Sequence, residues 1–218
     1  MYKKQIIESI DIESIKNEVL SDLKSVNRPG INNVIDFIIS SDYLYAPASS
    51  NYHLSCPNGL LIHSYNVKNN FELLSSIYNP NIEKDSIYLL SYLHDICKCN
   101  CYIKTVKNVK IRNKWIQIDG YKYNKEGIQG HGDLSVIMLL QMGLALTDTE
   151  ISAIQMHMGA FHFYHTWEMQ QQLNTTYSQY DEALLLHISD MISSYRTDVY
   201  SEIELSDDML LASKPNTY

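Results

Sequence analysis

The sequence predicts a mostly α-helical protein with one small β-hairpin inserted near the middle of the chain. Three observations predict this fold class. Apolar residues recur at helical spacing through most of the 218 residues. Residues 101–123, in contrast, are rich in the β-branched and aromatic residues that favour strands. Proline and glycine separate the periodic segments, as at residues 27–30 and 79–80.

The N-terminal half of the chain predicts several helices and one ordered loop. One or two amphipathic helices come first, with apolar positions at Ile6, Ile10, Ile15, Val19 and Leu23. A second helix should span residues 31–41. Residues 43–58 contain many turn-forming residues and predict an ordered loop. Long helices should follow at about 59–78 and 84–98.

Helical periodicity returns after the hairpin. A helix is expected at about 133–143, and the capping box of residues 147–150 should open another at about 148–158. Asp181 should begin a helix that runs to about 196, and a last helix is expected over 200–212. A chain of this length can bury one sizeable core, so a single structural domain is expected. Within it, N-terminal helices (1–44) pack on a core (45–198), and a C-terminal helix and tail follow (199–218).

The composition is that of a globular protein, with 45% hydrophobic and 19% charged residues. No run of 18 apolar residues predicts a membrane span. The first residues turn acidic too early for the apolar stretch of a signal peptide. Without such a signal, Cys56 and the three cysteines of residues 97–101 are expected to be reduced thiols. These features predict a cytoplasmic protein that does not insert in a membrane.

The net charge of -8 is unevenly distributed along the chain. Residues 98–125 contain eight of the 17 basic residues and one of the 25 acidic residues, Asp119. An acidic body repels polyanions, so a substrate that carries phosphate would be drawn to this positive segment. The alternative is that this segment is a solvated hairpin whose surface carries more basic than acidic residues and binds no substrate.

Four of the eight histidines and two aspartates form a candidate metal site. They are His63, His94, His131 and His157, with Asp95 and Asp190. Each aspartate lies in an otherwise apolar helix, where an ionised carboxylate is costly unless a cation or a metal ion pairs with it. One such residue can be a cap or a hydrogen-bond partner. Two of them with four dispersed histidines favour a metal site.

Imidazole and carboxylate ligands suit the divalent transition ions Mn, Fe, Co, Ni or Zn better than Ca or Mg. His94 and Asp95 are adjacent and point about 100° apart on a helix. They can reach one ion together only near a helix end, or they can reach two neighbouring ions. Lys98 lies four residues after His94 on the same helix face, where it can contact a phosphate.

Around these residues the chain resembles the HD-domain superfamily of metal-dependent phosphohydrolases. The resemblance covers roughly residues 45–195 and rests on five segments in order. They are Asn58-Gly-Leu-Leu-Ile-His63, Tyr92-Leu-His-Asp95-Ile-Cys-Lys98, His131-Gly-Asp-Leu-Ser135, Ile154-Gln-Met-His157 and Leu186-His-Ile-Ser-Asp190. The chain departs from the family at Asn58-Gly59, where relatives often have two glycines. This difference leaves the ligands unchanged.

The resemblance implies an HD-domain helical bundle with two metal ions. The first ion would be bound by His63, His94, Asp95 and Asp190. Asp95 would bridge to a second ion held by His131 and His157, although some members of the family work with one ion. The implied reaction is hydrolysis of a phosphoester or phosphoanhydride bond of a nucleotide by a metal-activated water, with Asp95 and Lys98 as catalytic residues.

Several other residues have two interpretations. His53, in the loop before the site, is either a substrate-side histidine or a loop hydrogen-bond partner. His162 lies in an aromatic segment that is either exposed or a pocket wall on which a base stacks. His187 is expected to be a partner of a ligand or a core histidine. The alternating cysteines of residues 97–101 have the wrong spacing for a zinc knuckle and are expected to be ordinary thiols.

The substrate stays open between two classes. The basic segment with Trp115, Tyr121 and Tyr123 suits a small nucleotide or a short single-stranded RNA or DNA, the latter implying a 3′–5′ exonuclease or phosphodiesterase. The acidic remainder argues against an extended nucleic-acid surface, so a small nucleotide is favoured. Two rivals are a non-catalytic HD module that binds a nucleotide and a structural helical protein with histidines as core polar groups.

Overall fold

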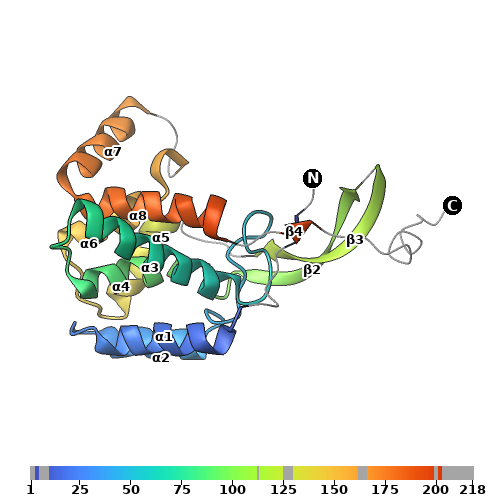
Figure 1. The fold of residues 1–218 in the computed structure, drawn as a ribbon, viewed down its shortest axis with the longest axis horizontal. Coiled ribbons are helices and arrows are strands. Elements are labelled where there is room, and N and C mark those ends of the chain that lie inside the picture. The colour runs from blue at the N-terminus through green and yellow to red at the C-terminus, as the bar shows by residue number, and fades with distance from the viewer. Residues whose placement is uncertain are drawn as a thin grey trace.

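The computed structural model describes residues 3–4, 10–111, 113–124, 130–161, 166–198 and 201–202. Within them the chain is mostly helical, with eight α-helices and a two-stranded antiparallel hairpin, which confirms the coarse fold class. The helices form one body and the hairpin extends away from it (Figure 1). Among the described residues, no helix is both long and apolar enough to cross a membrane.

The N-terminal helices are α1 (Ile12–Ser25) and α2 (Ile31–Ser40). Asp11 caps α1 by accepting a hydrogen bond from the amide of Ser14 at 3.0 Å. The buried face of α1 consists of Ile15, Val19 and Leu23, the periodic positions of the sequence. The helical prediction is confirmed over Ile12–Ser25, whereas the predicted position Ile6 lies outside the described residues.

The described residues near the two chain ends form strands. Strand β1 (Lys3–Lys4) pairs antiparallel with β4 (Ser201–Glu202). The helix expected over 200–212 is therefore wrong at Ser201 and Glu202, and its remainder lies outside the described residues. Pairing between the two ends of a chain depends on tertiary structure, which local periodicity does not encode.

Helix α3 (Gly59–Tyr78) has the predicted bounds and packs against α1, α4 (Lys84–Leu93) and α8 (Asp181–Ile192). The loop that precedes α3 is fixed to the core. The Tyr43 hydroxyl, fully buried, donates a hydrogen bond to the carbonyl of Tyr92 at 2.6 Å. Asn58 adopts a left-handed backbone with φ 62°, a conformation that glycine and asparagine tolerate best.

Gly59 allows the loop to close on the first turn of α3. A Cβ at this position would lie 2.1 Å from the carbonyl oxygen of Leu54 and 2.7 Å from the amide nitrogen of Ala48. We expect Gly59→Ala to destabilise the protein by about 1–3 kcal/mol, because the backbone must shift to admit the methyl group. Denaturant unfolding measures the effect. Ser76→Ala, on the exposed side of α3, is the control and should change stability by less than about 0.5 kcal/mol.

Helix α4 ends at Leu93, five residues before the predicted end. Asp95 has φ -109° and ψ 17°, outside the helical region, and a 3-10 turn follows at Ile96–Lys98. His94 and Asp95 therefore lie at a helix end. This is the arrangement in which both side chains can point to one place.

Strands β2 (Tyr102–Ile111) and β3 (Lys114–Tyr123) form the predicted hairpin. Tyr102 pairs with Tyr123 at its base, and Ile111 pairs with Lys114 next to the turn. Asn113 in the turn has φ 67°, the left-handed conformation common in short hairpin turns.

The remaining helices are α5 (His131–Gln141), α6 (Asp148–Met156), α7 (Trp167–Gln179) and α8. The predicted capping box is confirmed, since Thr147 and Glu150 each accept a hydrogen bond from the other's amide. Helix α8 ends at Ile192, four residues early, because Ser193–Thr197 forms a π-helical turn. Helix α7 is absent from the sequence-based expectations. Thr176 is its one buried residue, so it lacks the apolar periodicity that predicts a helix.

Candidate metal centre

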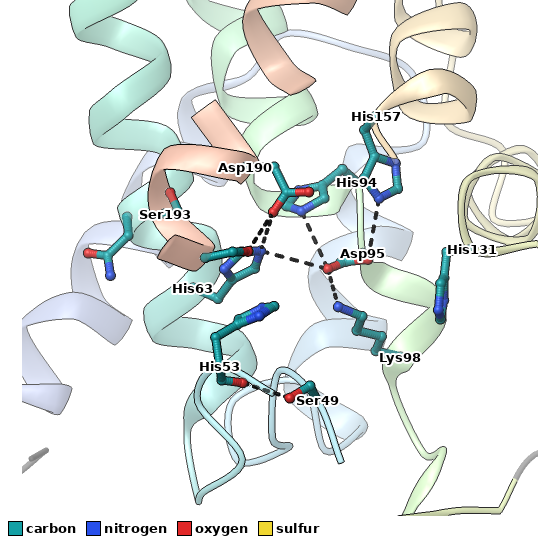
Figure 2. A network of polar contacts seen from close by, with 12 residues as sticks. Ser49, His53, His63, His94, Asp95, Lys98, His131, His157, Asp190 and Ser193 are labelled. Atoms are coloured by element: carbon teal, nitrogen blue, oxygen red, sulfur yellow. Dashed lines mark hydrogen bonds and ion pairs between the residues drawn. The ribbon is translucent and has the colours of Figure 1, made fainter. Parts of the chain in front are cut away.

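Five polar side chains from four helices converge in the interior of the helical body (Figure 2). They are His63 of α3, His94 and Asp95 after α4, His157 after α6 and Asp190 of α8. The three histidines are fully buried and Asp95 is 2% exposed. Segments far apart in the sequence thus bring five of the six predicted metal ligands into one cluster.

Asp95 lies at the centre of this cluster. Its Oδ2 is 3.4 Å from His94 Nε2 and 3.8 Å from His63 Nε2. Its Oδ1 is 3.6 Å from His157 Nε2, and Asp190 Oδ1 is 3.2 Å from His63 Nε2. Ligands about 2.0–2.2 Å from an ion lie up to about 4.4 Å from one another. The spacing of these atoms therefore suits direct coordination.

Backbone carbonyls orient two of the imidazole rings. His94 Nδ1 lies 2.9 Å from the carbonyl oxygen of Ser91, and His157 Nδ1 lies 2.6 Å from that of Ile154. A carbonyl accepts hydrogen bonds, so Nδ1 carries the proton in each neutral ring. The lone pair of each Nε2 then points into the cluster, as in histidines that bind metals through Nε2.

The cluster contains buried polar atoms without hydrogen-bond partners. They are Nε2 of His63, His94 and His157, and Oδ1 of Asp95. A buried polar atom without a hydrogen-bond partner costs free energy, and such atoms are rare in native proteins. His63, His94 and Asp95 form one compact group of possible metal ligands, and His94, His157 and Asp190 form a second. Such atoms in one buried cluster suit metal binding, and imidazole with carboxylate suits Mn, Fe, Co, Ni or Zn.

The protonation states of Asp95 and His94 also suit metal binding. Burial opposes ionisation of Asp95, but Lys98 and His94 hold its pKa well below the usual range. Burial lowers the pKa of His94, which favours the neutral ring that a metal requires. Burial also opposes charge on His63, but Asp190 and Asp198 raise its pKa to about 10. In the metal-free protein His63 therefore supplies the positive charge that a bound ion would replace.

Asp198 is a site residue that the sequence analysis does not identify. It is 1% exposed, and its Oδ2 lies 3.4 Å from His63 Nδ1, on the side of the ring away from the cluster. Asn66 Nδ2 donates a hydrogen bond to Asp198 Oδ1 at 2.9 Å. This carboxylate can orient His63 and increase its basicity. Its position depends on the π-helical turn after α8, for which the sequence has no clear signal.

Lys98 lies beside the cluster and is buried. Its Nζ donates a hydrogen bond to Asp95 Oδ2 at 2.5 Å. Burial opposes its charge, but Asp95 raises its pKa above the ordinary lysine value, so the ammonium stays protonated at neutral pH. The predicted phosphate contact thus has a fixed positive charge next to the candidate metal ligands.

His131, the sixth predicted ligand, begins α5. Together with Asp95 and Cys97 it forms a group whose ligand atoms all lie within 4.8 Å of one another. His157 belongs to a different group, whose other members are His94 and Asp190 and whose ligand atoms also lie within 4.8 Å of one another. Among the described residues, the expected second-ion set of Asp95, His131 and His157 is therefore not one compact group.

The other predicted residues surround the cluster. The His53 ring is 4.7 Å from the His63 ring, and burial together with the charges of His63 and Lys98 lowers the pKa of His53 to about 3. A neutral imidazole therefore faces the site from the loop. His187 Nδ1 is 2.6 Å from the carbonyl oxygen of His157, so it packs behind a candidate ligand. His162 lies outside the described residues.

Metal binding should stabilise the protein. An ion at 100 times its Kd contributes about 2.7 kcal/mol, which corresponds to a Tm increase of roughly 5–11 °C for a chain of this size. We expect this increase when chelator-treated protein receives Mn, Co, Ni or Zn, because the ion gives a partner to buried atoms of His63, His94 and Asp95 that otherwise have no hydrogen bond. Thermal unfolding followed by circular dichroism measures it. An unchanged Tm with every ion would contradict the assignment.

Comparison of the chain with models of protein families, with curated proteins and with solved structures found no match. The candidate metal centre therefore rests on the sequence motifs and on the geometry described above.

Proposed function

We propose that this protein is a metal-dependent phosphohydrolase that cleaves a phosphoester or phosphoanhydride bond of a nucleotide. One observation carries the proposal: three unpartnered imidazole nitrogens and a carboxylate oxygen converge beside the buried ammonium of Lys98. The first set suits a divalent transition ion, and the ammonium suits a phosphate. The five segments that resemble the HD-domain superfamily support the same reaction.

The residues of the site have distinct roles in this proposal. When bound, a divalent ion lowers the pKa of a coordinated water and neutralises charge on phosphoryl oxygens. His63, His94, Asp95 and Asp190 hold it in place. Lys98 turns from Asp95 to a phosphoryl oxygen and stabilises the charge that develops there. No protein nucleophile is required.

A substrate screen tests the proposal. The full chain is stripped with a chelator, reloaded with Mn, Co, Ni, Mg or Zn, and incubated with nucleoside mono-, di- and triphosphates, cyclic nucleotides and short oligonucleotides. We expect turnover of a nucleotide with a transition ion and none without metal. Metal and nucleotide bound without turnover would favour a non-catalytic nucleotide-binding module instead. A protein that binds no metal would favour a structural role.

A second candidate function is 3′–5′ exonuclease or phosphodiesterase action on short single-stranded RNA or DNA, and the hairpin favours it. Directly opposed residues of an antiparallel pair share a face, so the register sorts the hairpin into two faces. One of them, here called the aromatic face, includes Lys104, Val106, Lys110, Trp115, Tyr121 and Tyr123. Trp115 is 59% exposed, and both lysines are exposed.

The opposite face of the hairpin is partly covered. Ile116 is buried there, and the Lys107 ammonium donates hydrogen bonds to the carbonyl of Ser50 and to Asn51 Oδ1 of the loop. The aromatic face is thus the more exposed one. It combines rings on which bases can stack with ammonium groups that can contact phosphates. It begins at Tyr102, four residues after Lys98 in the sequence.

Neutralising the two lysines of the aromatic face tests this candidate. If it binds an oligonucleotide, Lys104→Gln/Lys110→Gln should weaken binding and reduce the salt slope by about 0.7 for each phosphate that a lysine no longer neutralises. Activity on mononucleotides should change little. Lys114→Gln/Lys122→Gln, exposed residues of the opposite face, is the control with the same charge change. Equal decreases in affinity in both variants, or no decrease in either, would exclude the aromatic face as a binding track.

A further inference from the structure

Cys97 differs from the other two cysteines of residues 97–101. It is 2% exposed, and its Sγ lies 3.6 Å from His131 Nδ1. The Cys101 thiol, in contrast, donates hydrogen bonds to the carbonyl oxygens of Cys97 and Cys99. Among the described residues, Cys97 is the one cysteine that falls in a compact group of possible metal ligands, with Asp95 and His131.

The fold fixes Cys97 against the start of α5. The amide of Cys97 donates a hydrogen bond to Ser135 Oγ at 3.3 Å, and Ser135 lies one helical turn after His131. The 3-10 turn that carries Cys97 also packs against α5. The contact between sulfur and imidazole is therefore part of the packing of these two elements.

Two observations support ion binding by this group. Asp95 Oδ1 is buried without a hydrogen-bond partner. In addition, tetrahedral zinc ligands at about 2.3 Å for sulfur and about 2.05 Å for nitrogen lie about 3.6 Å apart, which equals the observed separation. A hydrogen bond from the His131 ring to the sulfur would have a similar length, and the experiment below separates the two cases.

We propose that Cys97 is a ligand of the second metal ion, together with Asp95 and His131. The inference rests on the proposed metal centre and changes the expected ligand set of its second ion. When the ion binds, the S–H bond breaks, a metal–sulfur bond forms and the proton leaves to solvent, with no change of oxidation state. A thiolate ligand favours thiophilic ions such as Zn²⁺ over Mg²⁺ and Mn²⁺ at this site.

Cobalt titration of the full chain tests this assignment. A thiolate bound to Co²⁺ gives a near-ultraviolet charge-transfer band that imidazole and carboxylate ligands do not give. We expect this band with the second equivalent of Co²⁺, in the wild type and in Cys99→Ser. Cys97→Ser should lack the band and should bind the second ion at least about 10-fold more weakly. Cys99 is the matched control because it is buried and close in sequence, and lies outside the ligand group.

Each other outcome has a definite meaning. Bound cobalt without the band in the wild type overturns the role of Cys97 and leaves the first metal site intact, and this result needs no variant. A band that persists in Cys97→Ser also overturns it. If the wild type binds no cobalt at all, the proposed metal centre itself fails.

Discussion

Asp95→Asn is expected to lower kcat/KM on a nucleotide substrate by roughly 10³-fold or more. Asp95 touches three histidines and Lys98 within 4 Å, so the amide removes the central negative charge of the site. The transition state then loses several kcal/mol of charge stabilisation, and each 1.36 kcal/mol added to the activation free energy lowers the rate about tenfold. Steady-state kinetics measures the decrease, and elemental analysis measures bound metal, which should fall as well.

Asp36→Asn, on the exposed side of α2, is the matched control and should leave both quantities unchanged. Far-ultraviolet circular dichroism should show the same helix content in both variants, because Asn has nearly the shape of Asp. An Asp95→Asn protein that keeps its metal and its activity would contradict the central role of this carboxylate.

Lys98→Met should lower kcat by roughly 10²–10³-fold while the protein keeps its metal. The Lys98 ammonium lies 2.5 Å from Asp95 Oδ2, so it competes with an ion for this oxygen. Removing the charge should leave metal affinity equal or higher, although the phosphate is no longer stabilised. Metal binding and turnover therefore separate in this variant, whereas they fall together in Asp95→Asn.

Turnover and metal titration of the same preparation measure this separation. Lys84→Met provides a control at an exposed lysine of α4 and should behave like the wild type. If Lys98→Met loses its metal, the lysine is needed to hold the metal ligands in place. Unchanged kcat would remove it from the reaction.

Local rules in the sequence predict the regular parts of the fold. Periodicity gives the bounds of α3, and the capping box at Thr147 gives the start of α6, because both signals depend on neighbouring residues alone. The end of α4 is different, because the non-helical backbone of Asp95 depends on the elements around it. Apolar periodicity does not predict helix α7, because its surface is almost entirely exposed. The N-cap residue Thr166 and the helix-forming residues that follow it are the available sequence signal.

The sequence predicts those site residues whose type is unusual for their surroundings. Histidines and aspartates in apolar helices are conspicuous, and five of them converge. Asp198 was missed because a π-helical turn, not a motif, brings it to His63. The spacing of the three cysteines argues against a zinc knuckle and gives no reason to select Cys97. Its contact with His131 joins segments 34 residues apart, which spacing among cysteines does not reveal.

The central claim is that the buried cluster around Asp95 binds a transition ion. Anomalous diffraction from crystals of the protein loaded with one such ion, recorded at the absorption edge of that ion, locates the ion directly. We expect a peak enclosed by His63, His94, Asp95 and Asp190. A fully loaded crystal whose peaks all lie elsewhere, or that has none, would contradict the account.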